Sequence, residues 1–88
     1  MRIYELRPGS RDRANSFYGK AKVIENDGET LLQSYDTIVC KIDKNGKFAR
    51  VWEGYSVTTM RHVNAFAEMF GISGRGKKWW DSQETKKH

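Results

Sequence analysis

The sequence predicts an α+β domain in which a four-stranded antiparallel sheet carries one amphipathic helix packed on one face. Residues 17–53 alternate apolar and polar side chains with a period of two, which is typical of strands. Two turn motifs, Asn26-Asp27-Gly28 and Asn45-Gly46, interrupt this alternation and favour hairpins. The apolar residues that follow, up to residue 70, recur at three- and four-residue spacing, which is typical of a helix.

The same signals predict the bounds of each element. The four strands are predicted at residues 17–24, 30–35, 37–42 and 48–53. The helix is predicted to begin after Ser56, whose hydroxyl can cap it, and to end at Gly71. A short basic C-terminal tail or helix follows, with the helix expected around residues 77–83.

The chain is expected to have three parts. Residues 1–16 form a basic N-terminal arm, because Pro8, Gly9 and the polar run after them show no periodicity. Residues 17–71 form the ββββα domain, and residues 72–88 form a basic aromatic tail. No internal repeat or low-complexity tract is visible.

Length and composition limit the class of protein. A chain of 88 residues and 10.2 kDa has room for one small domain, and 12% aromatic residues argue against disorder along the whole chain. The single cysteine, Cys40, excludes an internal disulfide and a multi-thiolate zinc site. The sequence shows no secretory signal and no membrane span, so we expect a cytoplasmic protein without a membrane partner.

The positive charge is concentrated at the two ends. Lysine and arginine number 16 against 11 acidic residues, which gives a net charge of +5. Residues 1–22 hold six basic and two acidic residues, and residues 71–88 hold five basic and two acidic residues. Residues 23–70 hold five basic and seven acidic residues. We therefore expect any anion-binding surface to be built from the termini.

The N-terminal arm supplies the first candidate binding residues, Arg7, Arg11 and Arg13. Arginine binds phosphate through its planar fork of donors, so these side chains are candidates for contact with nucleic acid or an acidic protein groove. A solvated basic loop without a ligand is an equally open interpretation.

The C-terminal segment supplies the second set of candidates. These are Arg75, Lys77, Lys78, Trp79 and Trp80. Cations next to aromatic rings are typical of surfaces that follow a single-stranded backbone and stack its bases. The alternative is that one tryptophan packs in the core while its neighbour lies at the surface.

No residue pattern predicts catalysis, a cofactor or a metal site. His62 has only His88 as a second histidine, so a polar role inside the fold or at an interface is favoured over catalysis. An enzyme remains an option only where His62 meets a carboxylate such as Glu53 or Asp36 in a pocket. Cys40 lies mid-strand among apolar residues and is interpreted as a core side chain rather than a nucleophile.

Three segments of the middle of the chain carry a resemblance to a known family. They are residues 16–21 (SFYGKA), 32–40 (LQSYDTIVC) and 54–66 (GYSVTTMRHVNAF). The chain resembles a family of small uncharacterised proteins common in phages and mobile elements of Firmicutes, whose patterns are SY-x-T-x-VA and YS-x-TT-x-RH-x-x-EF. Cys40 stands where that pattern usually has alanine, and Ala65 where it often has glutamate. The resemblance implies a phage or mobile-element setting and no assigned activity.

The polar residues within these segments form a third candidate surface, at the predicted helix start. They are Tyr35, Thr37, Tyr55, Ser56, Thr58, Thr59, Arg61 and His62. A shared binding surface and a purely structural role are both open for this set. Arg61 and His62, expected on an exposed face, are the better functional candidates, with Tyr55 and Thr58 beside them.

Taken together, the sequence favours a non-enzymatic interaction module that binds nucleic acid or a nucleoprotein through its basic termini. The alternative is a protein-binding inhibitor of a host defence nuclease, comparable to an anti-CRISPR protein. A homodimer is also physically reasonable, because a four-stranded sheet with one helix has an open face and two edges.

Overall fold

The computed structural model describes residues 1–9 and 16–85, and it has five strands and two helices. The elements are β1 (Arg2–Glu5), β2 (Ala21–Asn26), β3 (Glu29–Ser34), β4 (Thr37–Ile42), β5 (Phe48–Arg50), α1 (Val57–Met69) and α2 (Gly76–Ser82). The α+β class is confirmed, but the prediction of four strands is wrong because the N-terminal segment contributes a fifth.

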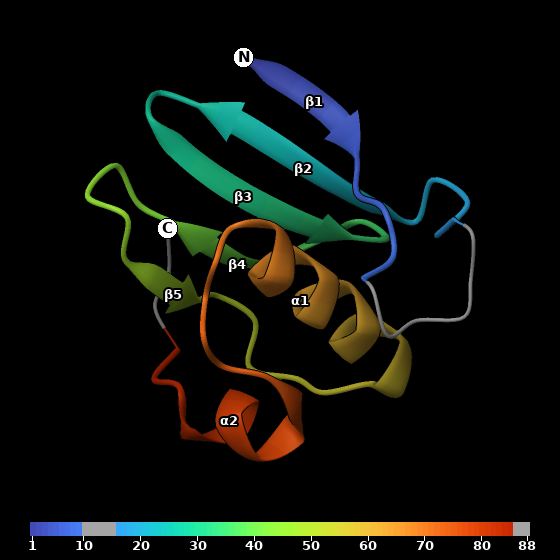
Figure 1. Ribbon diagram of the computed structural model, residues 1–88, viewed down its shortest axis with the longest axis vertical. Coiled ribbons are helices and arrows are strands. Elements are labelled where there is room, and N and C mark those ends of the chain that lie inside the picture. Colours follow the sequence, from blue (N-terminus) through green and yellow to red (C-terminus); the bar gives the residue numbers. More distant parts are fainter. Residues whose placement is uncertain (10–15, 86–88) are drawn as a thin grey trace.

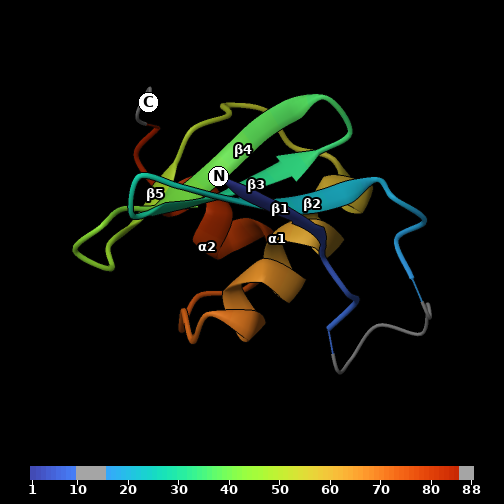
Figure 2. The same ribbon diagram turned by 90° about the horizontal axis from the view of Figure 1, so that it is seen from above.

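The five strands form one antiparallel meander in the order β1-β2-β3-β4-β5 (Figure 1). Both helices pack on the same face of this sheet, as the view from above shows (Figure 2). Neither helix in the described part of the chain is long and apolar enough to cross a membrane.

Strand β1 arises from residues that the sequence assigns to the basic arm. It pairs with β2 so that Tyr4 lies opposite Val23, and the next residue, Leu6, donates its backbone N–H to Ala21 over 2.9 Å. Leu6 is fully buried, and Tyr4 packs against the core. A strand of four residues is too short to show a clear alternation, which is why the pattern did not predict it.

Strand β2 begins later than predicted because a turn precedes it. Tyr18 and Gly19 have φ angles of 54° and 77°, and the Lys20 N–H closes the turn on the Phe17 carbonyl. Strand β5 also ends early, at Arg50, because the N–H groups of Val51 and Trp52 both donate to one carbonyl of β4.

Helix α1 follows the prediction closely. The Ser56 side chain accepts a hydrogen bond from the Thr59 N–H over 3.0 Å, so Ser56 is the N-cap. Gly71 has a φ of +72°, which ends the helix, and the Ile72 N–H then reaches back to the Ala67 carbonyl. The buried side of α1 covers the apolar side chains that β2, β3 and β4 present to it. Those include Cys40, which is buried as predicted, and burial raises the pKa of its thiol.

Candidate nucleic-acid interface

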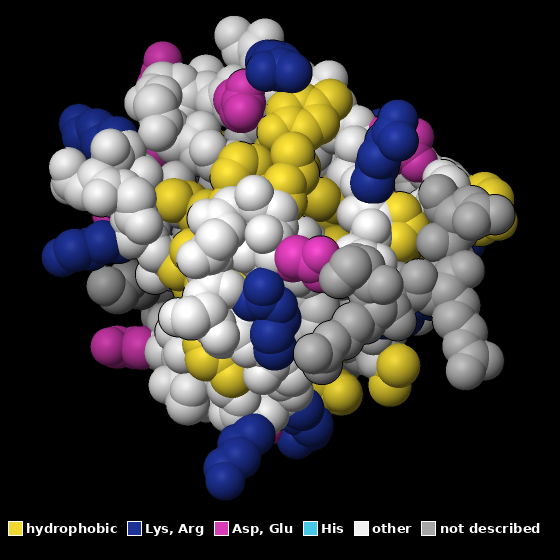
Figure 3. All heavy atoms as spheres, in the orientation of Figure 1, with side chains coloured by type: hydrophobic (Ala, Val, Ile, Leu, Met, Phe, Trp, Pro, Cys, Tyr) yellow, Lys and Arg dark blue, Asp and Glu magenta, His cyan; other side chains and the backbone are white. Residues whose placement is uncertain are grey.

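Helix α2 carries the exposed cations of the C-terminal segment. Lys77 and Lys78 lie in its first turn, next to the N-cap residue Arg75. The Lys77 ammonium lies 5.2 Å from the centre of the Tyr55 ring, which is 40% exposed. Lysine and arginine side chains project from the end of the molecule that contains α2 (Figure 3). We call Tyr55, Arg75, Lys77 and Lys78 the α2 cation surface.

Two of these cations already have local partners. Lys77 forms an ion pair of 2.8 Å with Asp81 one turn along α2, and this hydrogen bond raises the pKa of Lys77. The Arg75 guanidinium donates to the carbonyls of Ile72 and Gly74. An incoming phosphate would therefore compete with Asp81 for the Lys77 ammonium.

The two tryptophans are not exposed stacking rings. Trp80 is 1% exposed, and its indole N–H donates to the Gly54 carbonyl over 3.0 Å. Trp79 is half-buried, with its ring centre 5.0 Å from that of Phe48 and its indole against Gly74. The structure thus favours the interpretation that one tryptophan belongs to the core, and Trp79 also packs largely against the fold.

Arg50 fixes α2 to the sheet, a role that no sequence pattern predicted. Its guanidinium donates to the carbonyls of Trp52, Glu53, Gly54 and Trp80 over 2.5 to 3.2 Å. The same group lies 4.5 Å from the centre of the Trp80 ring. Arg50 is 6% exposed, so this cation is structural and does not belong to a binding surface.

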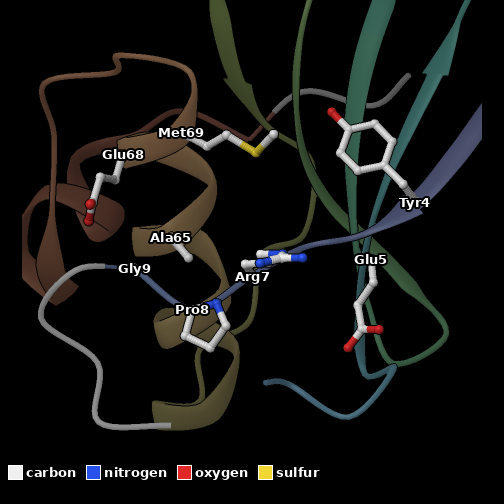
Figure 4. Close-up of a pocket in the computed structure, with 8 residues that line it drawn as sticks. All are labelled: Tyr4, Glu5, Arg7, Pro8, Gly9, Ala65, Glu68 and Met69. Atoms are coloured by element: carbon white, nitrogen blue, oxygen red, sulfur yellow. The ribbon is translucent and has the colours of Figure 1, made fainter. Parts of the chain in front are cut away.

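Of the three candidate arginines in the N-terminal segment, Arg7 lies within the described residues, while Arg11 and Arg13 lie outside them. Arg7 is exposed and lines a hollow of about 410 Å³ between β1 and α1 (Figure 4). Glu5 and Glu68 line the same hollow, with the apolar side chains of Tyr4, Ala65 and Met69. The hollow therefore carries both signs of charge.

His62 is buried, which corrects its predicted place on an exposed face. It is 1% exposed, and its Nδ1 atom lies 2.8 Å from the Ser34 hydroxyl. The Ser34 hydroxyl also lies 3.2 Å from the Thr59 hydroxyl. The helix faces the sheet at this position, so the His62 ring points inward, packed edge-on against Phe17 at 4.5 Å. A histidine enclosed in this way serves as a polar core residue.

Of the other candidates on α1, Thr58 and Arg61 are exposed, whereas Thr59 is buried. Thr58 and Arg61 lie three residues apart on α1, and the Arg61 guanidinium lies 5.8 Å from the Phe17 ring. The structure thus brings Arg61 towards the turn before β2 and Tyr55 towards α2. The described residues contain no cluster of three or more histidine, cysteine or acidic side chains able to hold a metal ion.

A second group of exposed side chains combines Tyr35, which belongs to the third candidate surface, with Tyr18 and Lys20, which were not among the predicted site residues. Tyr18 is 79% exposed and Tyr35 is 49% exposed, and the Lys20 ammonium lies 5.9 Å from the centre of the Tyr35 ring. We call Tyr18, Lys20 and Tyr35 the tyrosine platform. One feature of the sequence could have pointed to this platform. Each tyrosine directly precedes a Gly or Asp at a turn, where a large ring is unusual.

One comparison with known proteins identifies a family. Residues 4–82 match the model of a family of unknown function (DUF8033). The chain belongs to this family. The family match begins within β1 and ends at the last residue of α2, so it covers part of the additional strand β1 and the whole of α2. No curated protein and no solved structure matches the chain.

Proposed function

We propose that this member of the family binds nucleic acid, with the α2 cation surface contacting phosphate groups. The observation that carries the proposal is the Lys77 ammonium at 5.2 Å from the exposed Tyr55 ring, with Lys78 in the same turn. Cations beside an exposed aromatic ring are the side chains that bind a phosphate backbone and stack a base. The net charge of +5 favours such a polyanion.

The proposal keeps the predicted C-terminal site but changes the groups that act in it. Trp79 and Trp80 pack in the fold, so Tyr55 takes the stacking role that was predicted for a tryptophan. Arg7, Arg11 and Arg13 remain candidates for further phosphate contacts. The resemblance to phage and mobile-element proteins supports DNA, RNA or a nucleoprotein in a host cytoplasm as the natural partner.

The test is fluorescence anisotropy of labelled oligonucleotides at about 50 mM and about 200 mM salt. Each phosphate contact adds roughly 0.7 to 0.9 to the slope of log affinity against log salt. The double variant Lys77→Ala/Lys78→Ala should therefore bind more weakly and lower that slope by about 1.5. No binding at the lower salt concentration would refute the proposal.

Two further variants sharpen this test. Asp81→Asn removes the carboxylate that pairs with Lys77, so it should strengthen binding while the cations stay unchanged. Lys44→Ala/Lys47→Ala removes the same charge from the exposed β4–β5 turn and should leave most of the affinity. An equal loss of affinity in the two double variants would mean that net charge, and not the α2 cation surface, determines binding.

A protein-binding role, including inhibition of a host defence nuclease, is the second candidate. It is favoured by the sheet face opposite the helices, where Ile3, Ile24 and Leu31 lie side by side on three neighbouring strands. Ile3 is 56% exposed. For this function, Ile3→Asp should abolish stoichiometric capture of a partner or a second copy, and leave oligonucleotide binding unchanged.

A further inference from the structure

We infer that the tyrosine platform is a base-stacking site, and that the nucleic acid bound by this protein is single-stranded. The inference rests on the proposed function and adds a second site to it. Tyr18, Lys20 and Tyr35 come from two turns that meet at one end of the sheet. The backbone N–H of Tyr35 donates to the Lys20 carbonyl over 2.7 Å and so joins these turns.

Both tyrosines occupy backbone conformations that disfavour them. Tyr18 has a φ of 54° and Tyr35 a φ of 55°, in the left-handed region where glycine, asparagine and aspartate are common. Burial does not account for these residues, because most of the Tyr18 side chain and about half of Tyr35 are exposed. Large rings kept at strained, exposed positions point to a function that uses the rings.

The surrounding hydrogen bonds hold both turns in place. The Ser16 hydroxyl accepts the Tyr18 N–H and donates to the Glu5 carboxylate, which also accepts the Gly19 N–H over 3.0 Å. On the other turn, the Gln33 amide donates to the Tyr35 carbonyl over 2.8 Å. The backbone that carries the two rings is therefore fixed before a ligand arrives, which lowers the entropic cost of binding.

The Tyr35 ring is supported from the core. The centre of the His62 ring lies 5.9 Å away, and His62 in turn packs on Phe17. Lys20 adds a cation 5.9 Å from the Tyr35 ring centre, at a place suited to a phosphate next to a stacked base. Rings that lie on a surface stack mainly on unpaired bases, because a duplex covers its base faces everywhere except at its ends.

The experiment compares a labelled 20-nucleotide single strand with the duplex of the same sequence, using the full chain. Tyr35→Asn removes the ring but suits a positive φ, so this variant should keep or raise the melting temperature. It should bind the single strand about ten-fold more weakly and the duplex equally well. Tyr35→Phe keeps a ring and should keep single-strand affinity. Tyr18→Asn should behave like Tyr35→Asn.

Other outcomes of this experiment contradict either the platform inference or the proposed function. If the protein binds nucleic acid but Tyr35→Asn weakens neither form, or both forms equally, the platform is not a stacking site and the proposed function stands. If neither form binds at low salt, the proposed function fails and the platform inference with it. If single-strand affinity is unchanged while capture of a protein partner requires Tyr35, the platform is a protein contact and the inference is overturned. Val57→Asn, another exposed apolar residue, is the matched control.

Discussion

The Nδ1 atom of His62 and the Ser34 hydroxyl oxygen lie 2.8 Å apart, and this contact joins α1 to the end of β3. Thr59, one turn earlier on α1, shares the same hydroxyl at 3.2 Å. Three polar side chains are thus enclosed where the helix crosses the sheet. They fix the position of α1 more specifically than apolar contacts would.

Ser34→Ala should destabilise the fold by about 1 to 3 kcal/mol, because it removes a buried partner of both His62 and Thr59. Urea unfolding followed by circular dichroism measures this change. Thr58→Ala, on the exposed side of the same helix, should change the free energy of unfolding by less than about 0.5 kcal/mol. Equal effects of the two variants would contradict a structural role for the cluster.

Arg50→Met should cost about 2 to 4 kcal/mol, because four carbonyls each lose a hydrogen bond from a buried guanidinium. The loss should also shift the emission of Trp80, whose ring lies against the guanidinium. Arg2→Met is the control, since the Arg2–Glu25 ion pair is exposed and should contribute less than about 1 kcal/mol. An unchanged midpoint for Arg50→Met would show that α2 does not depend on this residue.

Gly74→Ala should destabilise the protein by about 1 to 3 kcal/mol through overpacking. A Cβ at this position would lie 1.9 Å from the Trp79 indole, so the ring must move away from Gly74, which changes its packing against Phe48. Near-ultraviolet circular dichroism detects that movement, and thermal unfolding measures the loss. Ser73→Ala, at the exposed neighbouring position, should leave both signals unchanged.

Stability should fall in acid through Glu5 and Asp43. Backbone hydrogen bonds, from Gly19 to Glu5 and from Lys47 to Asp43, lower the pKa of each carboxyl below its ordinary value of 4.5 or 3.8. A lowered pKa in the folded state gives stability that is fully present above the ordinary value and is lost as pH falls through the lowered one. Urea midpoints measured from pH 6 to pH 2 should decline in that window.

Asp43→Asn tests whether titration of Asp43 contributes to this loss of stability in acid. Its amide oxygen can still accept the N–H groups of Asn45 and Lys47, but it does not titrate. The variant should therefore lose part of the pH dependence below about pH 4. A decline identical to that of the natural chain would place the acid sensitivity in other groups.

Local signals in the sequence were sufficient to predict most of the fold. The Asp27-Gly28 turn, the Ser56 cap and the Gly71 stop are properties of a few adjacent residues, and the structure confirms them. Strand β1 was missed because four residues give too little alternation to distinguish a strand from an arm. Its place depends on pairing with β2, some twenty residues away in the chain.

The candidate site was harder to predict because exposure depends on tertiary contacts. His62 and Arg61 are adjacent in sequence, yet one faces the sheet and the other faces solvent. In the sequence, Arg50 resembles a surface strand residue. It is buried because α2 places the Trp80 carbonyl, thirty positions later in the chain, beside its guanidinium. The tyrosine platform needed two turns to meet, which no single motif encodes.

The contacts between Arg50 and Trp80 hold α2 against β5. The C-terminal cations on α2 therefore fold and unfold together with the sheet. A ligand that engages Lys78 then adds its binding free energy to the unfolding equilibrium of the whole domain. The unfolding temperature of the sheet itself should rise with ligand concentration, although no strand touches that ligand.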